Sequence, residues 1–335
     1  MLHVRVVTPS DRQAALVGEL EANLAICNIV VMPGAARRPA GDLVQFDVAR
    51  EAANGVLERL RQLDLHRVGS IAVDRIDTAL SDVAAAAEAH APGEPSEAVI
   101  WEEVEARVRG DSGLSPSFVA LLVIAVLIGA VGVLVDSPIL IVGAMVVGPE
   151  YGPLASVAMG LYGCRLRRVR RGLVALAVGF PVAIVAAASL TVVLRWADRI
   201  PLAYQLGERP LTNFISNPDL FAIIVAVLAG VAGTVSLTEA RSGALVGVLI
   251  SVTTIPAASN VGVALAMSRV GEAAGALGQL ILNLGILVVV GAVTLRLQAR
   301  LWLRLAVDSD AGKAGRVHRH GRTEAARTCL PPEPR

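Results

Sequence analysis

Glu150 is the residue of this chain whose type and setting most clearly suggest chemistry. It lies in the apolar run IVGAMVVGPEYGPLASVAMG, and no other Asp, Glu, Lys, Arg or His falls within six segments long enough to cross a bilayer. A charged carboxylate near the bilayer centre costs about 3 kcal/mol even on a lenient insertion scale. We therefore expect its side chain to face protein or water and to be functional. The alternative is a kinked, protein-packed helix in which Glu150 is protonated.

Two prolines surround this carboxylate and predict a break in the helix that carries it. Pro149 and Pro153 each remove a backbone donor and clash with the preceding turn. Backbone groups freed inside a membrane are tolerated only where they line a cavity or are buried in protein. The sequence therefore predicts a discontinuous second span, with Pro149, Glu150, Tyr151 and Pro153 along a solute or ion pathway.

A second break is predicted in the run SGALVGVLISVTTIPAASNVGVALA, where polar residues gather around a proline at mid-depth. These residues are Thr253, Thr254, Pro256, Ser259 and Asn260. Their side chains can replace the lost backbone bonds or coordinate a solute; alternatively, each hydroxyl bonds back to its own helix. Asn283, in the next span, either joins this pathway or links two helices.

The two breaks occupy corresponding places in the chain. Pro153-Leu154-Ala155-Ser156 is echoed by Pro256-Ala257-Ala258-Ser259, each in the middle segment of a group of three. Because three crossings separate the copies, they run in opposite directions. This layout predicts an inverted 3+3 repeat with two broken helices meeting at the midplane, which is the usual geometry of a secondary transporter site.

Composition places the chain in the membrane. Of its 335 residues 54% are hydrophobic and 18% charged, and the mean hydropathy is +0.62, which predicts an α-helical integral membrane protein. A net charge of +1 with a single lysine disfavours nucleic-acid binding. Three distant cysteines build neither a disulfide framework nor a zinc site, and all five histidines lie outside the spans, so we expect no cofactor, no metal and no enzyme.

Arginines between the apolar segments predict the orientation of the chain. We expect six spans, at 115–135, 139–163, 172–194, 220–238, 242–267 and 273–295. Arginines crowd the connector GCRLRRVRR at 163–171 and follow the sixth span, so both regions should face the cytoplasm. The expected location is the inner (cytoplasmic) membrane, with both termini cytoplasmic. The first residues, MLHVRVVTPSDRQ, do not resemble a signal peptide.

The part of the chain before the spans reads as a separate acidic domain. Residues 1–113 carry 11 Arg against 18 Asp and Glu. Over 1–77 the periodicity gives the order β-α-β-β-α-β, which predicts a ferredoxin-like α+β cytoplasmic domain. We expect a helical linker at 78–114, the six-span domain at 115–298 and a cytoplasmic, largely disordered tail at 299–335. The first domain serves either oligomerisation or ligand sensing.

Three runs carry a family resemblance. They are LVDSPILIVGAMVVGPEYGPLASVAMG, LTEARSGALVGVLISVTTIPAASNVGVALA and LILNLGIL. With the α/β domain ahead of them, they resemble the domain-of-unknown-function 389 family of hydrophobic bacterial and archaeal membrane proteins, over roughly residues 1–300. The family's first motif resembles G-A-M-x-x-x-P-x-x-G-P, onto which Gly143, Ala144, Met145, Pro149, Gly152 and Pro153 fall. The resemblance implies apolar residues at the positions of Glu150 and Tyr151, so this carboxylate is a feature of a subfamily.

Two classes of function follow from these patterns. A transporter or channel for a small polar solute or ion explains the broken helices, the lone carboxylate and the polar cluster. The alternative is a membrane-anchored sensor, signalling or scaffold protein that acts through its N-terminal domain, although an anchor needs no proline breaks. Spans rich in Gly and Ala predict close helix packing and a homo-oligomer in the lipid bilayer.

Overall fold

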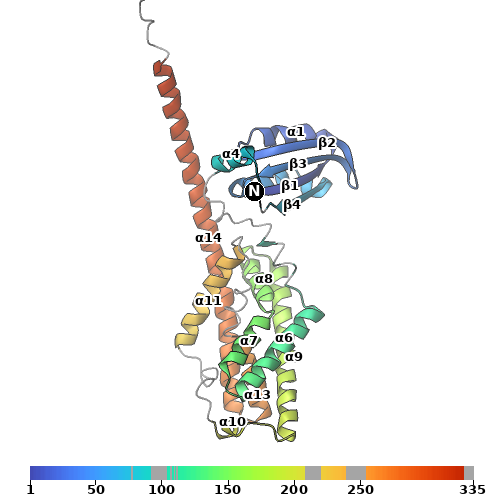
Figure 1. Ribbon diagram of the computed structural model, residues 1–335, viewed down its shortest axis with the longest axis vertical. Helices are drawn as coiled ribbons and strands as arrows, with labels where there is room; N and C mark the ends of the chain where they lie inside the picture. The colour runs from blue at the N-terminus through green and yellow to red at the C-terminus, as the bar shows by residue number, and fades with distance from the viewer. Residues whose placement is uncertain are drawn as a thin grey trace, which may run out of the picture. The chain divides into compact units, whose positions relative to one another are not determined.

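The structure is a computed structural model, shown in Figure 1. It describes residues 1–76, 78–91, 104–105, 108, 110, 112–207, 220–238 and 254–327, with backbone only after Leu301. Contacts divide the chain into two compact units. One comprises Met1–Trp101 with Ala299–Arg335, and the other comprises Glu102–Gln298.

A four-stranded antiparallel sheet forms the centre of the N-terminal unit. Its strands are β1 (Leu2–Thr8), β2 (Ile26–Arg37), β3 (Ala40–Val48) and β4 (Ser70–Arg75), in the spatial order β2-β3-β1-β4. The register places Val4 opposite Phe46 of β3 and Val73 of β4. Alternate residues of β1 and β3 are buried, as the period of two in the sequence predicts.

Helices pack against this buried face of the sheet. They are α1 (Ser10–Glu21) and α2 (Arg50–Gln62), with the single turn α3 (Leu65–Val68) before β4. Leu16 and Leu20 of α1 and Leu57 and Leu60 of α2 join one core cluster with the inward residues of the strands. A smaller cluster joins α4 (Asp82–His90) to Met1, Cys27 and Ala49. Strands and helices therefore follow each other in the predicted order.

The hairpin between β2 and β3 is longer than the sequence indicates. We predict a strand ending at Met32 and a loop over PGAARRPAGD, whereas β2 continues to Arg37, which pairs with Ala40. Proline is tolerated here because β2 is the edge strand and its register shifts between Met32 and Ala36.

The second unit consists of apolar helices. They are α6 (Pro116–Leu134), α7 (Pro138–Val147), α8 (Tyr151–Tyr162), α9 (Leu166–Trp196), the short α10 (Leu202–Leu206), α11 (Leu220–Thr238), α13 (Ile255–Ala266) and the part of α14 (Val270–Arg327) that ends at Gln298. Four of them, α6, α9, α11 and the Val270–Leu301 part of α14, are long and apolar enough to cross a bilayer. The pair α7 and α8 makes a fifth crossing if it is one span bent by 59°.

The six predicted spans therefore correspond to four or five apolar helices of sufficient length. Only the second half of the expected fifth span is described, as α13, and residues 242–253 lie outside the described residues. At 1.5 Å per residue, the 12 residues of α13 extend about 18 Å, well short of a hydrocarbon core of about 30 Å. Residues 299–335 are expected to form a largely disordered tail. In the structure the backbone is helical as far as Arg327, as the continuation of α14.

Small residues let these helices approach closely. A Cβ added at Gly172 of α9 would lie 2.6 Å from the carbonyl oxygen of Pro153, so only glycine allows this contact with α8. A Cβ at Gly262 of α13 would meet the Ala187 side chain of α9 at 2.7 Å. Such spacing is typical of helix packing in membranes, where small residues bring backbones together.

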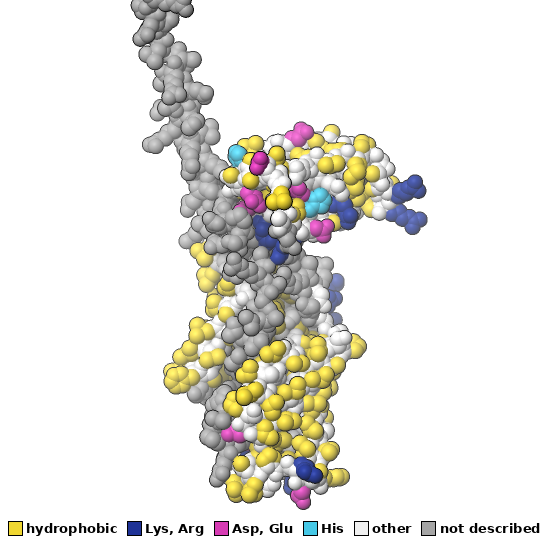
Figure 2. Space-filling model, in the orientation of Figure 1, with side chains coloured by type: hydrophobic (Ala, Val, Ile, Leu, Met, Phe, Trp, Pro, Cys, Tyr) yellow, Lys and Arg dark blue, Asp and Glu magenta, His cyan; other side chains and the backbone are white. Residues whose placement is uncertain are grey.

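The outer surface of these helices is apolar, which indicates contact with lipid. Ile139 is 84% exposed, and Phe221 is 73% exposed. Figure 2 shows hydrophobic side chains covering this unit, with charged side chains gathered near its end. A patch of this extent on a soluble protein would promote aggregation.

The N-terminal unit makes a prediction about pH. Burial raises the pKa of Glu51, in the first turn of α2, above its ordinary value. The folded state then favours the neutral carboxyl, so the free energy of unfolding falls as the pH rises through this raised pKa. In a fragment of residues 1–91, Glu51→Gln should raise the Tm by about 3 °C at pH 7 and leave it unchanged at pH 4.

Circular dichroism of the fragment during heating measures the Tm at pH 7 and at pH 4. Glu58→Gln, on the exposed side of α2, is the control and should change neither Tm. A random-coil spectrum for the fragment, or equal shifts for both variants, would contradict the assignment of an independent core and a buried Glu51.

Candidate functional site

Glu150 lies at the bend between α7 and α8. The first helix ends at Val147 and the second begins at Tyr151, so that residues 148–150 separate them. The Glu150 side chain has no exposed surface. The interruption predicted from the prolines around Glu150 coincides with this bend of 59°.

The two prolines act differently from each other. Gly148 has ψ of 125°, outside the helical region, as expected for the residue before a proline, and this ends α7. Pro153 is the third residue of α8, within the first turn, where no intrahelical bond needs its N–H. Pro256 is likewise the second residue of α13. Pro153 and Pro256 therefore begin helices, whereas Pro149 ends one.

A hydrogen bond joins the two predicted breaks. The Thr254 hydroxyl, directly before α13, donates to Glu150 Oε1 at 2.7 Å. Both side chains are completely buried, and 104 residues separate them in the chain. Of the polar residues predicted around Pro256, Thr254 is thus in contact with the carboxylate, while Thr253 lies outside the described residues.

The other predicted residues of this segment lie in the part of α13 that is buried on all sides. Every residue from Ile255 to Ala264 is buried, including Pro256, Ser259 and Asn260. The Ser259 hydroxyl lies 3.0 Å from the carbonyl oxygen of Val126 in α6 and 2.9 Å from that of Ile255. It therefore combines the predicted alternative, a bond to its own helix, with a link to a neighbouring helix.

Tyr151 and Asn283 lie at other interfaces between helices. The Tyr151 hydroxyl donates to the carbonyl oxygen of Gly233 in α11 at 3.0 Å. Asn283 is fully buried on α14, where Leu280 and Leu287 belong to the same core cluster as Ala257 and Ala258 of α13. The structure thus joins Glu150 directly to Thr254, and places Tyr151, Ser259 and Asn283 at the surrounding helix interfaces.

Two further buried polar residues are not predicted from the sequence. Gln279 is 5% exposed and lies one turn before Asn283, so that both fall on one face of α14. Thr234 of α11 is also buried and donates to the carbonyl oxygen of Gly230 at 2.7 Å. The spacing of four between Gln279 and Asn283 is a signal that the sequence offers for a polar face within an apolar helix.

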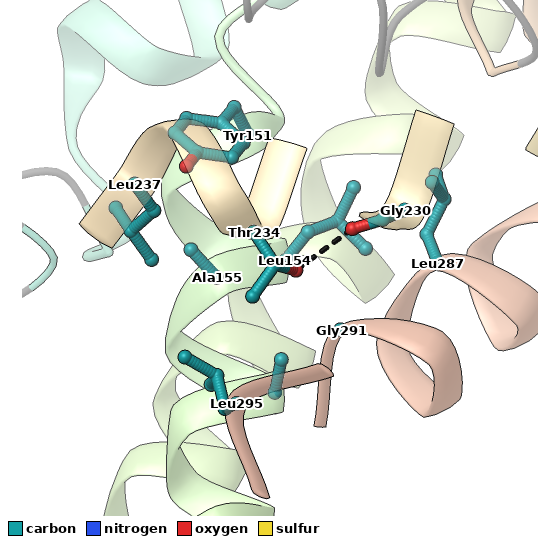
Figure 3. Close-up of a pocket in the computed structure, with 10 residues that line it drawn as sticks. Tyr151, Leu154, Ala155, Gly230, Thr234, Leu237, Leu287, Gly291 and Leu295 are labelled. Carbon is teal, nitrogen blue, oxygen red and sulfur yellow. Dashed lines mark hydrogen bonds between the residues drawn. The ribbon is translucent and has the colours of Figure 1, made fainter. Parts of the chain in front are cut away.

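A small cavity lies between α8, α11 and α14 (Figure 3). Tyr151, Leu154, Thr234 and Leu287 are among its lining residues, and its volume of about 20 Å³ matches on the order of one water molecule. Glu150 and Thr254 are not part of its lining. The carboxylate is thus packed in protein and does not face this cavity.

The chemistry available at the Glu150 site is that of oxygen and amide groups. Within the described part of the chain, no group of three His, Cys, Asp or Glu residues is placed to hold a metal ion. A carboxyl group and a threonine hydroxyl, in an apolar surrounding, can exchange a proton or bind a cation or a hydrogen-bond donor.

These features define the class of protein. Several apolar helices of membrane-spanning length, packed around a buried carboxyl, indicate a membrane-associated protein with a small antiparallel sheet at its N-terminus. The model of the family described as Domain of unknown function (DUF389) matches residues 145–289, which confirms the resemblance to this family. Among the curated proteins and the solved structures there is no match.

The Glu150–Thr254 bond predicts an effect on stability. Thr254→Val removes the donor and leaves the carboxyl oxygen buried, so it should lower the free energy of unfolding by about 1–3 kcal/mol. Thr234→Val is the matched control, because its hydroxyl bonds only within α11 among the contacts described, and it should cost clearly less. Urea unfolding in detergent micelles measures both, and equal losses would contradict a special role for Thr254.

Proposed function

We propose that this chain is a membrane transporter or channel for a small polar solute or ion. The observation that supports it most is the contact between the fully buried Glu150 and Thr254, because it joins the bend between α7 and α8 to the start of α13, far away in the sequence. Intramembrane carboxylates at broken helices are typical of ion and proton pathways. We propose that Asn260 and the backbone around both breaks complete the pathway.

An inverted repeat is part of this proposal. The chain's second half begins with α11, yet α13 packs on α6 and α9 of the first half. Reciprocally, α8 of the first half meets α11 through Tyr151 and Gly233, and α14 where Gly291 faces Ala158. Thus α13 packs mainly on the first half, whereas α8 packs mainly on α9 of its own half and touches the second half at these two points. These contacts across the halves support our proposal of six spans, with α13 as the second half of the fifth.

Movement at the bend would open the pathway. Residues 148–150 connect α7 to α8 and belong to neither helix, so a change at a few dihedral angles can swing one helix against the other. The cavity beside α8 holds little more than one water, which fits a closed state. We further propose the inner membrane as its location, a homo-oligomeric state and no enzymatic activity.

A sensor or scaffold function is the second candidate. The N-terminal unit has a groove of about 1180 Å³ along α1 and α2, lined by residues that include Leu20, Leu24 and Leu60. Leu24, which lines this groove, is 69% exposed, so its apolar side chain is accessible to a partner. We propose to class this unit as ferredoxin-like, a fold that serves sensors and oligomerisation modules alike.

The topology is tested by labelling single cysteines from either side of the membrane. With both termini cytoplasmic, a cysteine at Arg167 should react from the cytoplasmic side and one at Arg199 from the opposite side, because α9 runs between them. Reaction of both from one side would overturn the six-span arrangement.

Transport is tested in reconstituted vesicles with a broad panel of solutes and ions. Glu150→Gln removes the titratable group and should change the dependence of flux on pH or on the driving ion. Asn260→Leu should weaken solute binding, measured as a raised KM, without unfolding the protein.

The control is Asn54→Leu, in the N-terminal unit on α2, which should leave flux as in the wild type. If folded Glu150→Gln and Asn260→Leu proteins both match an active wild type, the pathway lies elsewhere. If the wild type moves nothing in the panel, the sensor or scaffold candidate takes precedence.

A further inference from the structure

The arginines that predict topology also line a pocket. Its volume is about 360 Å³, and its walls are Glu105, Val108, Ser112, Ser156, Arg167, Arg168 and Arg171. Because the three arginines are spaced by one and three residues at the start of α9, their guanidinium groups lie on one face of the helix. This pocket plays no part in the proposed transport pathway.

One carboxylate holds part of this arginine cluster in place. Glu105 accepts hydrogen bonds from Arg165, at 3.0 Å, and from Arg168. Arg168 is only 22% exposed, so its guanidinium is fixed by both packing and charge. Arg167 and Arg171 are exposed, and their groups reach the pocket from the solvent side.

The floor of the pocket is polar and buried. Ser112 and Ser156 are each 2% exposed, and their hydroxyls are the neutral polar side chains of the lining. Among the lining residues that the structure describes, three guanidinium groups and one carboxylate give a net charge of +2. A partly buried pocket with excess positive charge and hydroxyl groups favours an oxyanion.

We propose that this pocket binds a phosphate group carried on a larger molecule. Guanidinium groups match phosphate oxygens in geometry and donate two hydrogen bonds at once. The pocket is too large for inorganic phosphate alone but has the size of an ordinary small-molecule site. The phosphate belongs either to the headgroup of an anionic phospholipid or to a soluble phosphate ester; basic pockets beside membrane helices commonly bind such headgroups.

The test uses the full chain in nanodiscs of phosphatidylcholine, with or without phosphatidylglycerol. Native mass spectrometry counts the phosphatidylglycerol retained, and calorimetry follows titration with glycerol 3-phosphate. The pocket variant is Arg167→Gln with Arg171→Gln, whose exposed positions leave the helix packing intact. Arg170→Gln is the control, because this arginine has the same charge on the same helix but lines a different, apolar groove.

We expect the pocket variant to weaken binding by about tenfold for each arginine lost, with the control within about twofold of the wild type. Retention of phosphatidylglycerol alone identifies a lipid headgroup, and binding of glycerol 3-phosphate alone identifies a soluble ester. Equal losses in both variants would reduce the effect to surface charge and overturn the proposal. So would a wild type that binds neither probe.

Discussion

The burial of one carboxyl group is the constraint from which the arrangement of the apolar unit follows. Glu150 has no exposed surface, and a polar group removed from water requires hydrogen-bond donors from the protein. A continuous helix would offer it none from its own backbone. Pro149 ends α7, and the resulting bend places the carboxyl where Thr254 donates to it. The start of α13 is therefore tied to the start of α8.

This tie explains why α13 is short and central. The first ten of its 12 residues are all buried, so α13 cannot serve as a lipid-facing span and must be enclosed by longer helices. Glycines make that enclosure possible: Gly129 of α6 leaves room for the Ser259 hydroxyl, and Gly262 lets α13 approach α9. With side chains instead of hydrogens at these positions, α13 would be displaced and Thr254 would move away from Glu150.

Local signals in the sequence predict the elements but not their pairing. The alternation of Val4 and Val6 reveals a strand, and Pro149 beside Glu150 reveals an interruption, because each signal depends on neighbouring residues. The corresponding places of the two breaks predict that these segments meet, but the bond between Glu150 and Thr254 depends on how segments 104 residues apart pack, which no local pattern reports. Pro153 correctly marks the interruption but acts in another way than the sequence predicts: proline in the first turn of a helix costs no hydrogen bond, so this residue begins α8.

The hydrogen bond that closes the site also sets the conditions for opening it under the proposed function. Separating α8 from α13 breaks the bond between Thr254 and Glu150, at a cost of about 1.5–3 kcal/mol if the carboxyl is charged. Such a cost is comparable with the coupling energy between two conformational states. A proton, a cation or a solute that donates to Glu150 in place of Thr254 would offset it, whereas a solute without a donor would not. Opening would then depend on which proton, cation or solute is bound to the Glu150 carboxyl. Such a dependence is what couples ion binding to the movement of a helix.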